Sequence, residues 1–196
     1  MPVWIEDYLI LASPRDPDYL RTDPRAIVLE AGQCFGTGTH PTTRMCLQEL
    51  QQHLVAGDRV LDVGTGSGIL TIAAIRLGAG SAVALDRSLE ACRVARGNVG
   101  GNGLQQVIEV IAGTPAALGG SAAFDVVVAN LDTGDEVAQW LQTLTGHCRE
   151  RGRVILSGFQ AHAEGIMLKA AAAASLGPLS RRTQGLWVCL VFQRMP

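Results

Sequence analysis

Three glycines at alternating positions, in the segment LDVGTGSG at residues 61–68, form a pattern suited to holding a ligand. Gly64, Gly66 and Gly68 follow a short apolar run typical of a strand and precede one typical of a buried helix. A glycine turn in this place lets a ligand approach the backbone closely at the carboxyl edge of a parallel sheet. Tight strand–helix turns without a ligand also use glycine, so the glycines alone leave both interpretations open.

Two carboxylates beside this turn narrow the choice of ligand. The spacing is GxGxG, whereas GxGxxG is typical of pyrophosphate binding, and Asp62 just before the first glycine would repel phosphates. Asp86 ends the next predicted strand, 22 residues after Gly64, and a carboxylate there can accept hydrogen bonds from both ribose hydroxyls. Together with its neighbour Arg87, Asp86 is a candidate cofactor contact. A negative turn without a phosphate cradle disfavours a nicotinamide dehydrogenase and suits a cationic nucleoside such as S-adenosylmethionine.

A further polar position ends the predicted strand FDVVVAN, residues 124–130. Asn130 would lie at the same carboxyl edge as the glycine turn, where parallel α/β sheets bind their ligands. Asparagine also ends strands simply as a turn former, so a ligand contact and a turn are both open. Asp132 is a candidate base only if it faces the crevice, and its place in a turn favours the plainer interpretation. No catalytic base is assigned, and Asn130 is the candidate for orienting a substrate.

The segment FGTGTHPTT, residues 35–43, predicts a loop that runs into a helix. Its glycines permit sharp bends, Pro41 suits a first helical turn, and Thr39 or His40 can cap that turn. The buried face of the helix would consist of Cys46, Leu47, Leu50 and Leu54. His40 has no carboxylate partner nearby in the sequence, which favours a structural hydrogen bond over a role as catalytic base.

Strand-like and helix-like segments alternate through the rest of the chain. The predicted strands are 59–63, 81–86, 107–112, 124–130 and 153–158. The predicted helices are 68–79, 88–98, a segment around 137–144, and 163–174. Near-continuous apolar strands alternating with helices predict an α/β, Rossmann-like fold with a mostly parallel sheet covered on both faces. The last two strand patterns meet across Gly185 and predict an antiparallel pair.

The composition is that of one packed domain. The chain has 196 residues, of which 47% are hydrophobic and 17% charged, so it can bury enough apolar surface to fold. We predict a strand-rich extension over residues 1–30 and a single cofactor-binding domain over residues 31–196. A surface so poor in charge is suited to docking, and a homodimer is one arrangement that would use it.

Charge and cysteine content disfavour several other classes. A net charge of −2 gives no overall basic field for nucleic acid, and the run Arg149, Arg151 and Arg153 is interpreted as a solvated turn. The first residues lack the basic flank of a signal peptide, and no apolar run reaches membrane-spanning length. The five scattered cysteines have neither CxxC nor zinc-site spacing, so we expect reduced thiols, a cytoplasmic location and no metal.

Several of these segments together resemble a known family. In order they are FGTGTHPTTRMCLQEL, VLDVGTGSGILTIAAIRLGA, VALD, FDVVVANL, LSGF and LWVCLVF, from about residue 27 to the C-terminus. They resemble the class I methyltransferase domain of the PrmA-type ribosomal-protein methyltransferases. The resemblance implies a seven-stranded sheet with an antiparallel C-terminal strand, S-adenosylmethionine as cofactor, and methylation of an amino group of a ribosomal protein. It implies cofactor contacts at Thr43, Gly64, Asp86 and Asn130. The segment 35–43 would close over the methionine end of the cofactor, and its first residue, Phe35, is a further candidate cofactor contact.

The chain also departs from the family pattern. The family usually has a separate N-terminal domain that holds the substrate, where this chain has at most about 30 residues. Asn130 is followed by LDTGDE, which brings Asp132, Asp135 and Glu136 to the expected substrate mouth. Three functions therefore stay open: methylation of a lysine or N-terminus of a protein, methylation of a small amine, and a non-catalytic S-adenosylmethionine-binding or scaffold protein.

Overall fold

The structure is a computed structural model that describes most of the chain. The described residues are 3–5, 9–13, 15–18, 22–30, 38–119, 123–131 and 134–196. For residues 3–5, 9–11 and 134–137 the structure describes the backbone only.

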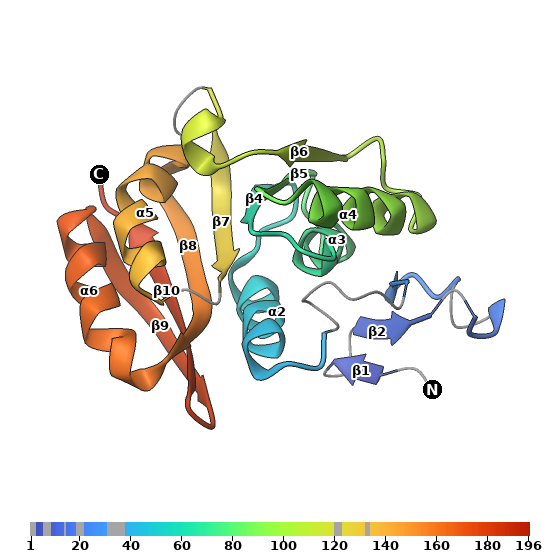
Figure 1. The fold of residues 1–196 in the computed structure, drawn as a ribbon, viewed down its shortest axis with the longest axis horizontal. Coiled ribbons are helices and arrows are strands. Elements are labelled where there is room, and N and C mark those ends of the chain that lie inside the picture. The colour runs from blue at the N-terminus through green and yellow to red at the C-terminus, as the bar shows by residue number, and fades with distance from the viewer. Residues whose placement is uncertain are drawn as a thin grey trace.

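The centre of the molecule is a seven-stranded sheet with the strand order β6-β5-β4-β7-β8-β10-β9 (Figure 1). Its strands are β4 (Arg59–Val63), β5 (Ser81–Asp86), β6 (Ile108–Ala112), β7 (Phe124–Asn130), β8 (Cys148–Gln160), β9 (Leu176–Gln184) and β10 (Trp187–Arg194). Strands β4 to β8 pair in parallel, whereas β10 is antiparallel to both of its neighbours, β8 and β9. The predicted mostly parallel sheet with an antiparallel C-terminal strand is confirmed.

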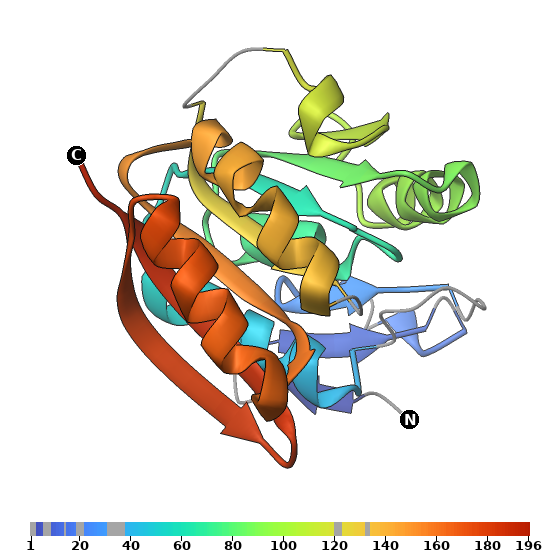
Figure 2. The same cartoon turned by 60° about the vertical axis from the view of Figure 1, so that its left-hand side comes forward.

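Helices cover both faces of this sheet. The described helices are α2 (Pro41–His53), α3 (Ile69–Arg76), α4 (Leu89–Gly101), α5 (Gly134–His147) and α6 (Glu164–Ala173), with short 3-10 turns η1 (Pro115–Ala117) and η2 (Ala161–Ala163). Helices α2, α3 and α4 lie on one face, and α5 and α6 lie on the other, as Figures 1 and 2 show. The predicted α/β, Rossmann-like architecture is thus confirmed.

The hydrophobic core has two halves, one on each face of the sheet. Val60 and Ile155 belong to the half beneath α2 and α3, whereas Leu61 and Val154 belong to the half beneath α5 and α6. Successive side chains of a strand point to opposite faces, so a sheet covered on both sides needs strands that are apolar at nearly every position. This requirement is the physical reason for the continuous apolar runs in the sequence.

A small three-stranded sheet lies beside this domain. Its strands are β1 (Val3–Ile5), β2 (Leu9–Ala12) and β3 (Ala26–Val28), with β1 antiparallel and β3 parallel to β2. Asn102, just after α4, clamps β3: its Oδ1 accepts from Val28 N at 2.9 Å and its Nδ2 donates to Val28 O at 2.7 Å. These strands fall within the predicted strand-rich extension, and its boundary at residue 30 remains a prediction.

Several elements are longer than the sequence predicts, among them α5, β8 and α4. Strand β8 begins at Cys148 instead of residue 153, because Gly152 lets it pass close to β7; a Cβ at Gly152 would lie 2.8 Å from Asp125 O. Helix α4 continues to Gly101, beyond the expected end near residue 98. The residue just after this end, Asn102, is the one that reaches β3.

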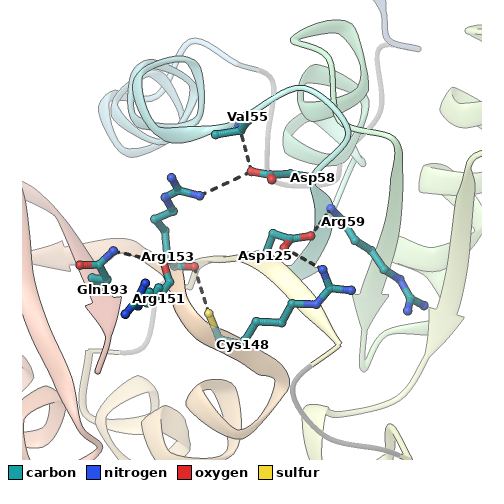
Figure 3. Close-up of polar contacts among 9 residues, drawn as sticks. Val55, Asp58, Arg59, Asp125, Cys148, Arg151, Arg153 and Gln193 are labelled. Atoms are coloured by element: carbon teal, nitrogen blue, oxygen red, sulfur yellow. Dashed lines mark hydrogen bonds and ion pairs between the residues drawn. The ribbon is translucent and has the colours of Figure 1, made fainter. Parts of the chain in front are cut away.

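The arginine run lies at the amino-terminal edge of the sheet, where β7 and β8 begin (Figure 3). Arg149 pairs with Asp125 at 2.9 Å, and Arg153 lies 3.7 Å from Asp58. Arg151 lies within β8, with φ +61°. Two of the three arginines thus have carboxylate partners. The prediction of a turn is wrong, because β8 already pairs with β7 at Cys148 and the whole run lies within this strand.

Three further findings concern the membrane, metals and thiols. None of the described helices is both long and apolar enough to cross a membrane. Within the described ranges, no group of three or more histidine, cysteine or acidic side chains could hold a metal ion. Cys46, Cys92, Cys148 and Cys189 are buried free thiols, and Cys34 lies outside the described residues.

Candidate functional site

The glycine turn connects β4 to α3 at the carboxyl edge of the sheet. Gly64 N and Thr65 N both donate to Leu85 O, at 2.8 and 3.0 Å, which anchors the turn to the neighbouring strand β5. Gly64, Gly66 and Gly68 all have positive φ, between 54° and 83°. The turn therefore follows a path that side chains with a Cβ rarely adopt, and it exposes backbone in front of the N-terminus of α3.

Asp62 lies beneath this turn and is only 1% exposed. Its Oδ2 accepts from the hydroxyls of Thr65 at 2.7 Å and Thr71 at 2.6 Å, while its Oδ1 is buried without a partner among the described residues. Burial raises the pKa of Asp62 to about 6, with a smaller contribution from the charge of Asp86; the two threonine hydroxyls act in the opposite direction. The two hydrogen bonds to Oδ2 thus connect Asp62 to the turn and to α3, and Oδ1 can accept a further hydrogen bond.

Asp86 ties the turn to the next helix. Its Oδ2 accepts from Gly66 N at 3.0 Å, and its Oδ1 accepts from Ser88 N at 2.9 Å. Each carboxylate oxygen has a second lone-pair site, so the group can still accept hydrogen bonds from a ligand. Arg87 is exposed beside it. Ser88 caps α4, since its hydroxyl accepts from Ala91 N at 3.2 Å.

The start of α2 faces the same edge of the sheet. His40 is its N-cap residue, and His40 Nδ1 accepts from Thr42 N at 3.4 Å and lies 2.8 Å from Thr42 Oγ1. Pro41 opens the first turn, as the sequence predicts. The His40 ring meets the ring of Trp187 edge-on, with centroids 4.8 Å apart. These contacts support the structural interpretation of His40 as a capping residue.

Thr43 and Asn130 meet at this edge. Asn130 Nδ2 donates to Thr43 Oγ1 at 3.3 Å, which joins α2 to the end of β7. Thr43 is fully buried, and Asn130 Oδ1 is a buried acceptor without a partner among the described residues. A buried amide oxygen without a hydrogen bond is unfavourable, so a donor supplied by a ligand would satisfy it.

The structure adds Asn98, a residue that the sequence prediction did not include. Asn98 is 2% exposed on α4; its Nδ2 donates to Ser67 O at 2.8 Å and its Oδ1 accepts from Glu30 N at 3.0 Å. It therefore connects the glycine turn to the segment that leads toward α2. The available signal was an asparagine on the otherwise apolar face of α4, with Ala91, Ala95 and Val99.

Four predicted positions lie wholly or partly outside the described residues. Phe35 and Asp132 lie outside the described residues, and so do the side chains of Asp135 and Glu136, whose backbone belongs to the first turn of α5. The remaining predicted positions come together at one edge of the sheet, from β4, β5, β7, α2 and the turns that follow the strands. They are Thr43, Asp62, Gly64, Gly66, Gly68, Asp86, Arg87 and Asn130.

This strand order, with an antiparallel strand inserted next to the last one and a glycine turn after β4, is that of the class I methyltransferase fold. A crystal structure of Burkholderia thailandensis 1,6-didemethyltoxoflavin-N1-methyltransferase with bound S-adenosylhomocysteine shares this fold, with a TM-score of 0.67 and 19% identity over 81% of this chain and 80% of that one. The model of the family described as ribosomal protein L11 methyltransferase (PrmA) matches residues 1–195. The chain belongs to this family.

Individual relatives agree with the family match. The ribosomal protein L11 methyltransferase of Geobacter sulfurreducens is 37% identical over 98% of this chain and 62% of its own length. A crystal structure of a ribosomal protein L11 methylase from Lactobacillus delbrueckii subsp. bulgaricus has a TM-score of 0.86 and 30% identity, and covers 100% of this chain and 98% of that one. The chain spans about six-tenths of the length of the curated relatives it matches.

Proposed function

We propose that this chain binds S-adenosylmethionine at the carboxyl edge of the sheet and methylates an amino group of a protein, with ribosomal protein L11 as the candidate acceptor. The observation that carries the proposal is the buried, unpartnered Oδ1 of Asn130. This oxygen belongs to an amide fixed by Thr43, at the sheet edge that also carries the glycine turn and Asp86. The names of the family and of its relatives support the choice of acceptor.

The residues at this edge fit such a cofactor. They offer hydrogen-bond acceptors, namely the carboxylate of Asp86 and the free oxygens of Asp62 and Asn130, to a ligand that carries ribose hydroxyls and positive charge. Asp86 would hold the ribose, and the glycine turn leaves its backbone open to close approach. Asp62 would contribute negative charge from below the turn. When bound, S-adenosylmethionine supplies the activated methyl group, and the protein supplies alignment and exclusion of water.

The acceptor amine must be neutral before it can attack a methyl group. For a lysine with a reference pKa of about 10.4, losing the proton at pH 7 costs roughly 4–5 kcal/mol. Asn130 Oδ1 can accept one N–H of the neutral amine and so orient the lone pair, while Thr43 holds the amide in place. The described residues thus provide an orienting group, and no general base is assigned.

Two measurements test the proposal. Calorimetric titration with S-adenosylhomocysteine, with NAD as the control, should give micromolar binding of the first and none of the second. Transfer of tritium from labelled S-adenosylmethionine to purified ribosomal protein L11 should then occur with the natural chain and fall sharply in Asn130→Ala. Binding without transfer to L11 would favour a small-amine acceptor, and the absence of binding would favour a scaffold; either result overturns the proposal.

A further inference from the structure

Leu131, directly after Asn130, packs between Gly64 and Gly158, which are far apart in the sequence. On one side is Gly64 of the glycine turn, where an added Cβ would collide with the Leu131 side chain. On the other side is Gly158, near the end of β8, where an added Cβ would lie 2.5 Å from the carbonyl carbon of Leu131 and 2.7 Å from its nitrogen. Real Cβ atoms essentially never come so close to backbone, so position 158 has room for hydrogen alone.

The end of β8 also sets the register of the Asn130 segment. Asn130 pairs with Ser157 in the parallel register of β7 and β8, and Leu131 N donates to Ser157 O at 3.1 Å. Ser157 is itself fixed: it is fully buried, and its hydroxyl donates to Val188 O on β10 at 2.8 Å. The backbone of Asn130 and Leu131 therefore pairs with the end of β8, which is itself hydrogen-bonded to β10 through Ser157.

We propose that Gly158 is a positioning residue for methyl transfer, because its missing side chain lets the Asn130–Leu131 backbone seat against β8 and so places the Asn130 amide. A side chain at 158 would push Leu131 away by a large fraction of an ångström or more. Such a shift moves the amide relative to Thr43, and misplacement of a reacting pair by about 1 Å lowers a rate by about 100-fold. This inference rests on the proposed function for its effect on the rate.

Gly158→Ala has a matched control elsewhere in the chain. Gly158 has φ +96° and Gly57 has φ +90°, but nothing lies within 4 Å of a Cβ added at Gly57, which sits at the opposite edge of the sheet. The two alanine variants thus suffer similar backbone strain, and only one meets the Asn130–Leu131 segment. Any loss of kcat in Gly158→Ala beyond that in Gly57→Ala therefore measures the effect of displacing Asn130 and Leu131.

In the full chain, with saturating S-adenosylmethionine and L11 as acceptor, we expect kcat of Gly158→Ala to fall about 10- to 100-fold below that of Gly57→Ala. Affinity for S-adenosylhomocysteine should fall less than kcat, because the hydrogen bonds from Gly66 N and Ser88 N to Asp86 do not involve Leu131. Equal kcat in the two variants, or a loss of affinity as large as the loss of kcat, would overturn the inference.

A second readout does not depend on the acceptor. The side-chain amide resonance of Asn130, assigned by its disappearance in Asn130→Ala, should shift in Gly158→Ala and stay in place in Gly57→Ala. If the natural chain transfers no methyl group to L11, the proposed function fails while this resonance still decides the role of Gly158. If Gly158→Ala does not fold, Ser157→Ala replaces it, since it frees the strand end from Val188; an unmoved Asn130 resonance there would refute the inference.

Discussion

Asn130 Nδ2 donates to Thr43 Oγ1 across 3.3 Å, although 87 residues separate the two positions in the chain. The bond joins the end of β7 to the first turn of α2, and it uses the amide nitrogen as donor, so the amide oxygen remains free. Two motifs that the sequence offered separately, FGTGTHPTT and VVVAN, thus form one arrangement. The hydroxyl of Thr43 thus fixes the orientation of the Asn130 amide.

This bond predicts energetic coupling between the two side chains in methyl transfer. Thr43→Val keeps the shape of the side chain and removes the hydroxyl, and Asn130→Ala removes the amide. Because either change alone breaks the same bond, the double variant should lose less kcat than the product of the single losses, by a coupling energy of about 0.5–1.5 kcal/mol. Steady-state kinetics of the four proteins measures it. Strictly multiplicative losses would show that the two residues act independently; Thr183→Val, on the exposed part of β9, serves as the neutral control.

Asp86 is predicted to control affinity for the cofactor. Asp86→Ala removes acceptors for the ribose and also releases Gly66 N and Ser88 N, so the affinity for S-adenosylhomocysteine should fall at least about tenfold, as expected for a charge-assisted hydrogen bond of about 1.5–3 kcal/mol. Calorimetric titration provides the measurement, with circular dichroism to verify the fold. Glu109→Ala is the control, because Glu109 is an exposed carboxylate on the neighbouring strand β6. Unchanged affinity in a folded Asp86→Ala protein would remove Asp86 from the site.

The sequence predicts those parts of the site that follow from local position along a strand. Gly64, Asp86 and Asn130 each come directly after an apolar run, and parallel strands bring their carboxyl ends to one edge of the sheet. Thr43 follows instead from the resemblance to the family, which the motif FGTGTHPTT carries. For the other three residues the strand order need not be known in detail, because every parallel strand of such a sheet ends on the same side.

Contacts between distant segments could not be predicted in this way. Gly158 is needed because Leu131 passes against it, and no local pattern reveals a backbone that approaches from another strand. Asn98 is similar, since both of its partners come from other elements. For Asp62 the sequence predicts a charge beside the turn but not the burial of the side chain. In the structure Asp62 is buried, and the hydroxyls of Thr65 and Thr71 donate to it. Its contact with a cofactor stays a prediction.

The burial of Asp62 predicts a pH-dependent stability. Its pKa is raised to about 6 in the folded protein from 3.8, so the folded state holds this proton more tightly than the unfolded state. The associated stability is fully present below about pH 4 and is lost as the pH rises through about 6, by at most roughly 3 kcal/mol. Asp62→Asn lacks this titration. The free energy of unfolding of Asp62→Asn relative to the natural protein should therefore rise between pH 4 and pH 7. Urea unfolding of both proteins across this range measures the difference, and a constant difference would contradict the raised pKa.

Adjacent arginines on β9 provide the last prediction, which concerns how α2 is held against the sheet. Arg182 Nε donates at 2.9 Å to Glu49, a carboxylate of α2 that is 1% exposed and also accepts from the Ser180 hydroxyl at 2.8 Å. Arg181 instead pairs with Glu164 near the surface. Removing Arg182 leaves the buried Glu49 carboxylate with only the Ser180 hydroxyl and His53 Nε2, 3.1 Å away, as partners among the described residues, whereas surface pairs contribute about 0–1 kcal/mol. Arg182→Ala should thus lower the free energy of unfolding by about 2–4 kcal/mol and Arg181→Ala by less than about 1 kcal/mol. Urea unfolding of the two variants tests this order, and equal losses would show that Glu49 is stabilised well enough without Arg182.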